Sequence, residues 1–318
     1  NMLQIILNEF EFNNVNIIFA ITGLLITILT IPFIKAKIEE HQKKYYSLLV
    51  IYVLSFLIVV FTKNWLLFFI AWEMVTITTS LMLLWSDKGL TSQYLIIQFL
   101  GSSILLFVIL VVINNVYDHL MPVKETWLQN LFIVGLGMKS SIIGLHFWMA
   151  PIYFKASSIF NALSSGWVVK LGFITLLKLI DSGNNLLLVA GVIMIFYGGI
   201  RALLTANYKV LFAYSSISQL GYIAIAIGSG TIYGYLGGII HIIAHVFAKT
   251  GLFLDSGNLI KKEDNSFIYN FNNSWFMDKS TILIIIISFA SLTGIPMLVG
   301  FNSKYLIKYG FPDNLYIT

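Results

Sequence analysis

Seven side chains that can hold a proton lie inside long apolar stretches of this sequence. Three of them follow one another at steps of four residues in IIHIIAHVFAKTGLFL, residues 239–254. In a helix, steps of four place side chains in one stripe, about 6 Å apart along the axis. Histidine titrates near neutral pH, and lysine and glutamate complete a set suited to acid–base exchange. The seven side chains are Glu73, Lys139, Lys170, His241, His245, Lys249 and Lys304.

The energetic cost of these positions indicates a function. One ionisable group near the centre of a bilayer costs at least roughly 2.5–3.5 kcal/mol. Four or five uncompensated groups would cost more than about 10 kcal/mol, which is comparable to the stability of a domain. We therefore expect pairing, hydration or deprotonation. A lysine beside a carboxylate holds its proton, whereas the same lysine alone in an apolar site tends to lose it. Because Glu73 faces several lysines on other segments, a change of partners could move protons.

Other interpretations exist for some of these residues. His241 and His245 have a spacing at which two histidines can share a zinc ion, but the glutamate of a metalloprotease helix and an evident third ligand are missing, so we predict no metal. Lys170 follows Gly166 by four residues and could lie at a shallow depth. Lys209 lies at a loop edge, where a lysine by default reaches toward the membrane surface.

The segments that carry these residues are predicted to be membrane-spanning helices. The chain has 318 residues, of which 58% are hydrophobic and 10% charged, against about 25% charged in soluble domains. Because about 20 apolar residues cross a bilayer, the recurring apolar runs predict an all-α polytopic bundle of about ten or eleven helices in a single membrane domain, residues 1–318. The predicted spans are 15–34, 46–62, 65–85, 93–115, 128–149, 166–182, 185–205, 210–229, 231–260 and 281–300, with a last segment at 303–311.

Two stretches interrupt the helical pattern. MAPIYFKASSIFNALSSG, residues 149–166, contains Pro151, and TGIPMLVGFNSK, residues 293–304, contains Pro296. Proline removes a helical hydrogen bond, and irregular backbone at membrane depth is tolerated only inside the protein or beside a water-filled cavity. Broken helices therefore point to ion sites, although 149–166 could equally be an ordinary loop.

Charge and cysteine content limit the other classes of function. Lysine exceeds glutamate in the loop KAKIEEHQKK, residues 35–44, which places this loop on the cytoplasmic or matrix side. No basic surface is long enough for nucleic acid. The absence of cysteine excludes disulfides and Cys-ligated iron–sulfur or zinc centres, and we expect no cofactor in this chain. The abundance of Ile, Asn, Phe, Tyr and Lys fits an AT-rich genome, so we expect a mitochondrial inner or bacterial cytoplasmic membrane.

Five motifs, in order, resemble those of one family: the antiporter-like membrane subunits of respiratory complex I, also found in Mrp-type antiporters and membrane-bound hydrogenases. The resemblance covers about residues 46–308. The motifs are FFIAWEMVTITTSLMLLW, GLGMKSSIIGLHFWMAP with His146 and Pro151, NYKVLFAYSSISQLGY with Lys209, HIIAHVFAKTGLFLDSGNLI, and GIPMLVGFNSKYLI with Pro296.

The resemblance implies two inverted five-helix repeats, each with one broken helix: about 46–182 and a truncated second repeat, about 185–318. It implies that Glu73 pairs with Lys139 on the first broken helix and that Lys170 is the next link. His241, His245 and Lys249 would form the central axis, and Lys304 would lie near the outlet. Supporting roles would fall to His146, Lys209, Pro151 and Pro296. The expected partners are other membrane-arm subunits, the lipid bilayer and protons, with ubiquinone and redox chemistry in other subunits.

The sequence departs from the family in two ways, and three functions stay open. The chain is short at both ends, which fits a reduced protein, a split gene or a fragment. The loop after Pro151 lacks the family's acidic residue and second proline. The first interpretation is a proton-translocating subunit of a redox-driven complex of the NADH:quinone oxidoreductase type. The second is a component of a cation/proton antiporter or of a membrane-bound hydrogenase. The third is a structural membrane subunit. No sodium cage is evident, which favours H⁺; the paralogue type is not specified by these motifs.

Overall fold

A computed structural model describes residues 9–38, 41–84, 88–114, 119–260 and 279–311. This part of the chain is helical, and its one β-bridge joins Phe10 and Thr62. The helices are α2 (Asn14–Lys37), α3 (Gln42–Phe61), α4 (Trp65–Leu84), α5 (Lys88–Asn114), α6 (Thr126–Ser140), α7 (Met149–Lys155), α8 (Ser158–Leu163), the π-helical turn η1 (Ser164–Val168), α9 (Val169–Leu179), α10 (Asn185–Leu203), α11 (Tyr208–Gly228), α12 (Ile232–Ile260), α13 (Lys279–Thr293) and α14 (Val299–Tyr309).

The prediction of a polytopic helical bundle is confirmed. Within the described ranges, eight helical segments are long and apolar enough to cross a membrane, and α8, η1 and α9 together form one of them, Ser158–Leu179. Two further segments, α6–α7 and α13–α14, are interrupted. The chain is therefore an integral membrane protein, and the spans predicted from apolar runs match the helices to within a few residues at most ends.

The first broken segment differs from the prediction. One span was expected over 128–149, but α6 ends at Ser140, and the chain stays irregular until α7 begins at Met149. The physical cause is backbone conformation, because Ser141 has φ 55° and Gly144 has φ +85°. Pro151 does not cause the break: it lies in the first turn of α7, where its missing N–H has no helical partner to lose. The next span also begins earlier than the predicted residue 166, at Ser158.

The second break is where the sequence predicted it. The helix α13 ends at Thr293 and α14 begins at Val299. Gly294 with φ +89° and Met297 with φ 76° turn the chain between them, and Pro296 lies exposed in the turn. The predicted span 281–300 is therefore too long at its C-terminal end.

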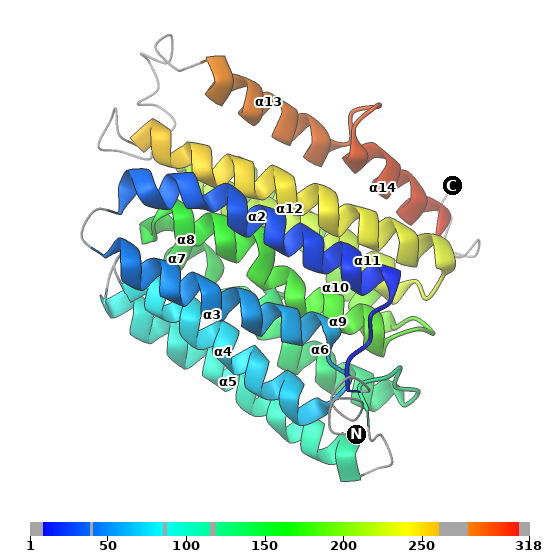
Figure 1. Cartoon of the computed structure of the whole chain (residues 1–318). Coiled ribbons are helices and arrows are strands. Elements are labelled where there is room, and N and C mark those ends of the chain that lie inside the picture. Colours follow the sequence, from blue (N-terminus) through cyan, green and yellow to red (C-terminus); the bar gives the residue numbers. More distant parts are fainter. Residues whose placement is uncertain (1–8, 39–40, 85–87, 115–118, 261–278, 312–318) are drawn as a thin grey trace.

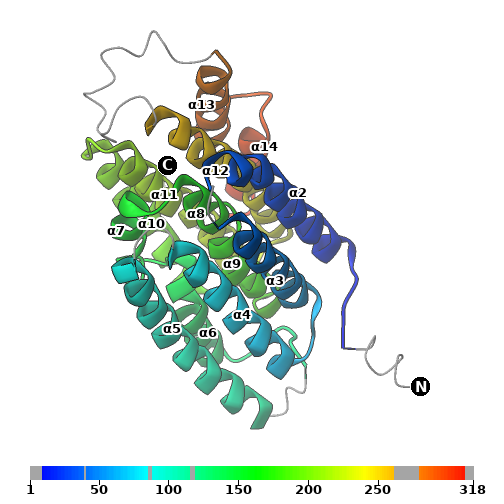
Figure 2. The same cartoon turned by 60° about the vertical axis from the view of Figure 1, so that its left-hand side comes forward.

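The segment α8–η1–α9 lies at the centre of the bundle. Every residue in its 18-residue apolar window is buried, and it packs against α2, α3, α6 and α12. Figure 1 shows it between α12 above and α4 and α5 below, and α13 and α14 lie along the outer side of α12 in both views (Figure 1 and Figure 2). The ionisable residues on α9 and α12 are thus held in the interior rather than on the lipid-facing surface.

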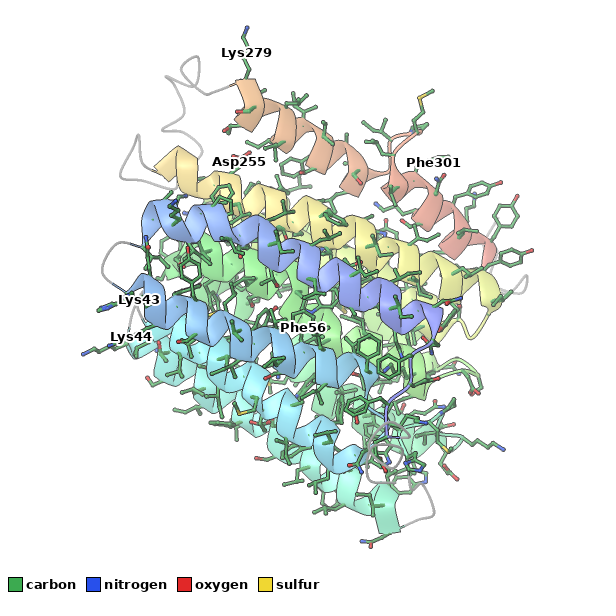
Figure 3. The ribbon with its side chains drawn as sticks, viewed as in Figure 1. Lys43, Lys44, Phe56, Asp255, Lys279 and Phe301 are labelled. Atoms are coloured by element: carbon green, nitrogen blue, oxygen red, sulfur yellow. The ribbon has the colours of Figure 1, made fainter. Side chains whose placement is uncertain are left out.

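The two ends of the bundle differ in charge. The lysine-rich face is the end at which α2 finishes and α3 begins, and Figure 3 shows Lys43 and Lys44 at this end, with Lys279 further along it at the start of α13. Helix direction also places Lys35, Lys37, Lys88, Lys155, Arg201 and Lys209 at this face. The opposite face has fewer basic side chains among the described residues, namely Lys63, Lys124, Lys178 and Lys308. By the positive-inside rule, this asymmetry predicts a cytoplasmic or matrix location for the lysine-rich face.

Candidate functional site: a buried row of ionisable side chains

Glu73 and Lys139 come together where the first broken segment meets α4. Glu73 is half-buried, and neither carboxylate oxygen has a hydrogen-bond partner among the described residues. Lys139, 2% exposed, donates from Nζ to Trp72 O at 2.9 Å and to Thr76 Oγ1 at 2.7 Å. Its Nζ also lies 3.9 Å from the centroid of the Trp72 ring. The lysine therefore contacts the residues around Glu73 and interacts with its charge, but it does not hydrogen-bond to the carboxylate.

The break after α6 gives Lys139 its setting. Lys139 lies in the last turn of the helix, where backbone carbonyls lack helical partners, and Trp148 Nε1 donates to one of them, Met138 O, at 2.8 Å. Next to Lys139, the Ser140 side chain packs directly against Gly172 of α9. The end of the broken helix is thus joined to the central segment that carries the next lysine.

Lys170 lies at the centre of the bundle and is fully buried. It donates from Nζ to the backbone oxygen of Ser165 in the π-helical turn η1. The Ser165 and Ser216 hydroxyls lie 3.0 Å apart and share a hydrogen bond, which reaches α11. A π-helical turn inside an α-helix is rare and is often found at functional sites. Here it supplies the oxygen that receives the lysine.

The stripe of His241, His245 and Lys249 on α12 is buried over its whole length, each residue at most 1% exposed. Lys249 donates from Nζ to Phe212 O at 3.0 Å and to Ser215 Oγ at 2.6 Å on α11. The two imidazole centroids are 6.4 Å apart. Neither ring nitrogen of His245 has a hydrogen-bond partner within the described ranges.

The seven side chains Glu73, Lys139, Lys170, Lys249, His245, His241 and Lys304 are called the row below. His245 lies between its members at the bundle centre and those at the second broken helix. Its ring interacts electrostatically with Lys170, Lys249, His241 and Lys304. A buried imidazole without a protein partner costs free energy unless water or a mobile proton donor satisfies it. This position therefore favours an exchangeable partner over a fixed one.

The last members of the row lie at the second broken helix. His241 Nδ1 is 2.9 Å from Ser303 Oγ on α14. Lys304 is half-buried, donates from Nζ to Leu292 O at 2.6 Å, and lies 4.4 Å from the centroid of the Tyr222 ring. Leu292 is in the final turn of α13, so the Lys304 ammonium is bound at the broken end of a helix, whereas Lys139 lies in such an end and is bound by α4.

The four supporting residues of the sequence analysis lie outside this row. Lys209 donates to Ala156 O at 2.9 Å and to Phe154 O at 3.4 Å, and so fastens the turn between α7 and α8. His146 is half-buried and packs edge-on against Tyr197, with centroids 4.8 Å apart. Pro151 and Pro296 are exposed. In the described part of the chain, no group of three potential metal ligands is found, so His241 and His245 belong to no such group.

Sequence reasoning missed the hydroxyl groups that receive the lysines. Thr76 and Ser215 bind ammonium groups directly, and Ser303 binds an imidazole. Gln98 of α5, 1% exposed, has no hydrogen bond from either amide atom within the described ranges, and the nearby Ser102 hydroxyl has none either. The available signal was polar clusters inside apolar spans, such as TITTS at 76–80 and SSIS at 215–218. Polar side chains that recur inside a membrane span find partners in other helices.

Comparison with known proteins identifies the family of this chain. The family model described as "NADH:quinone oxidoreductase/Mrp antiporter, TM" matches residues 62–312. NADH-ubiquinone oxidoreductase chain 5 of Patiria pectinifera is 30% identical over 291 residues, a match that covers 85% of this chain and 45% of the relative. This chain spans about half the length of the curated chain 5 relatives that it matches.

Solved structures share the fold. A chain of respiratory complex I from Thermus thermophilus with bound NADH matches with a TM-score of 0.79 at 22% identity, over 95% of this chain and 68% of that one. A chain of the Mrp complex from Dietzia matches with a TM-score of 0.73 at 24% identity, over 84% of this chain and 32% of that one. The same helical architecture therefore occurs in respiratory complex I and in the Mrp complex.

Proposed function

The chain belongs to the NADH:quinone oxidoreductase/Mrp antiporter transmembrane family, and on that premise we propose that it is a proton-translocating membrane-arm subunit of a redox-driven complex of the NADH:quinone oxidoreductase type. The observation that carries this proposal is the row from Glu73 to Lys304, which passes through α4, α6, α9, α12 and α14 and is buried at its five inner members, Lys139, Lys170, Lys249, His245 and His241. Groups this costly to bury are retained where they perform ion transfer.

Each link of the row has a geometry suited to proton exchange. Lys139 is held beside Glu73 by Trp72 O and Thr76 Oγ1, so a small movement brings the ammonium to the carboxylate or takes it away. A lysine near a carboxylate retains its proton, and one left in an apolar site releases it. Protons then pass between Lys170, His245 and Lys249 through water or hydroxyl groups. In this proposal the driving energy comes from redox reactions in other subunits, and this chain holds no cofactor.

The row also supports a division into two repeats, about 46–182 and about 185–318. Each would contain one broken helix with a lysine beside the break: Lys139 at the end of α6 and Lys304 in α14. Lys139 donates to the carbonyl of Trp72, the residue before Glu73, and Lys304 donates to the carbonyl of Leu292 near the end of α13. The proposed partners are further membrane-arm subunits, in a mitochondrial inner or bacterial cytoplasmic membrane.

A cation/proton antiporter is the second candidate, and the similarity to a chain of the Mrp complex favours it. It predicts that ion movement follows a sodium gradient and proceeds without electron transfer. Purification of the native assembly separates the two, because iron–sulfur subunits accompany the chain under the first proposal and do not under the second.

The direct test is proton movement in proteoliposomes that contain the purified complex. We expect Glu73→Gln and Lys249→Ala to abolish proton translocation while the complex stays assembled. Lys308→Ala is the matched control, since Lys308 is exposed on α14 one turn from Lys304. If the Glu73 and Lys249 variants pump at the wild-type rate, the proposed function is wrong, and loss of assembly alone would assign a structural role.

A further inference from the structure

A buried carboxylate outside the row remains unexplained by the proposed function. Asp255 of α12 is 4% exposed and is the one acidic side chain that is fully buried in the described part of the chain. Its Oδ1 accepts a hydrogen bond from Thr281 Oγ1 of α13 at 3.3 Å. It lies five residues before the end of α12, on the side of the lysine-rich face, and Figure 3 shows it at the same end of the bundle as Lys43 and Lys44.

The interface between α12 and α13, called the seam below, leads from Asp255 to His241 and Lys304 of the row. The two helices pack antiparallel, with Asp255 against Thr281 and Gly251 against Ile284 and Ser288. Going inward, the seam reaches Leu292, whose carbonyl receives Lys304, and then Ser303, which contacts His241. Steps of three and four residues from Asp255 put Gly251, Ala248, Ala244 and His241 on one face of α12.

The side chains on this face of α12 are small, and hydroxyl-bearing side chains of α13 lie opposite them, with Thr281 beside Asp255 and Ser288 beside Gly251. Ala244, Ala248 and Ser288 are all buried. Thr281 and Ser288 are seven residues apart, about 10 Å along α13, a distance that a chain of about three water molecules spans. Ser288 and Leu292 are one turn apart. Hydroxyl groups thus mark the seam at spacings that water can connect.

We propose that Asp255 is the proton-loading carboxylate through which the lysine-rich face exchanges protons with Lys304 and His241. The carboxylate takes a proton from hydronium at that face, so that one O–H bond breaks and one forms at the Asp255 carboxyl, and it then releases the proton to water in the α12–α13 seam; no bond between heavy atoms changes and no co-reactant is needed. This inference rests on the proposed function, because it assigns an access point to the same row. It also assigns a function to a carboxylate that lies one and a half turns inside the helix end.

The test uses the whole complex in proteoliposomes, with proton translocation measured per electron pair transferred. We expect Asp255→Asn to lower translocation roughly tenfold or more, because loss of a positioned proton-transfer group costs about 100-fold and water replaces part of it. Asp255→Glu should restore most of the rate. The control is Asp181→Asn, since Asp181 is exposed at the opposite face.

A purely structural role makes a different prediction. If Asp255 only ties α12 to α13, Thr281→Val should reduce assembly as much as Asp255→Asn does, and pumping per assembled complex should stay unchanged. Normal pumping by Asp255→Asn overturns the inference while the proposed function stands, provided Lys249→Ala is inactive. Normal pumping by both variants overturns both.

A second measurement uses the wild-type complex, so it does not depend on whether a variant folds. A hydrophobic carbodiimide modifies protonated buried carboxyl groups, and the modified residue is identified in peptides from the wild-type complex. We expect modification at Asp255 with matching loss of pumping. Modification of Glu73 without any at Asp255 would overturn the inference, because a loading site must spend time protonated.

Discussion

Replacement of Thr76 by valine tests how the first lysine of the row is held. Valine has nearly the same shape as threonine but lacks the hydroxyl that accepts a hydrogen bond from Lys139 Nζ at 2.7 Å. A hydrogen bond to a charged group contributes about 1.5–3 kcal/mol. Since every 1.4 kcal/mol is about tenfold in an equilibrium, the charged lysine should occupy this position about 10- to 100-fold less. We expect proton translocation by the proposed subunit to fall by about tenfold or more.

The assay compares proton uptake into proteoliposomes with electron transfer by the same preparation. Thr78→Val is the matched control, because Thr78 is buried on the same helix and its hydroxyl donates only to helix carbonyls, Met74 O and Val75 O. Both variants lose one buried hydroxyl, so both should assemble similarly. If Thr76→Val pumps within twofold of Thr78→Val, the hydroxyl does not control Lys139, and the reasoning from this contact is wrong.

Three further predictions concern neighbouring contacts. Gly172→Ala places a methyl group onto a serine hydroxyl of α6 and 3.1 Å from Leu136 O, so we expect about 1–3 kcal/mol of destabilisation in thermal unfolding. Gly199→Ala is the control and should be neutral, because its nearest neighbour is 3.9 Å away. Lys209→Met removes the donor to the α7–α8 turn and should lower the amount of assembled subunit without changing pumping per complex. Ser215→Ala removes the hydroxyl bound by the α12 lysine and should slow proton translocation about tenfold while assembly is kept, as native gels and pumping assays would measure.

The spans could be predicted from sequence because membrane helices must satisfy all their backbone groups internally, so long apolar runs leave few alternatives. The break at Gly294 and Pro296 was likewise visible in residue types. The resemblance implied a broken helix at Lys139, but residue types did not show the position of the break after Ser140, because it depends on a left-handed serine and a turn that carry no proline. A left-handed backbone at a non-glycine residue is uncommon, so no pattern within a single sequence indicates it.

The positions of the ionisable residues were predictable, but their partners were not. Burial of a charge within an apolar run is evident from sequence alone, whereas the acceptor of Lys139 lies 63 residues away and that of Lys249 34 residues away. Such contacts depend on how helices cross, which local sequence does not specify. Asp255 was overlooked for a related reason, since it lies near a helix end, where an acidic side chain ordinarily reaches water.

The contacts of the four lysines share one feature that bears on mechanism. Each Nζ donates to a backbone carbonyl: Lys139 to Trp72, Lys170 to Ser165, Lys249 to Phe212 and Lys304 to Leu292. A neutral amine still has N–H donors, so the hydrogen bond to a carbonyl persists when the proton leaves, whereas an ion pair would be lost. The lysines can therefore change protonation state without leaving their positions, which keeps the reorganisation at each step small. Glu73 is the acid beside Lys139, and no acid is hydrogen-bonded to these four lysines among the described residues. Under the proposed function, the charge that drives each step therefore comes from a neighbouring member of the row, and a proton that moves at one end changes the proton occupancy of the next member.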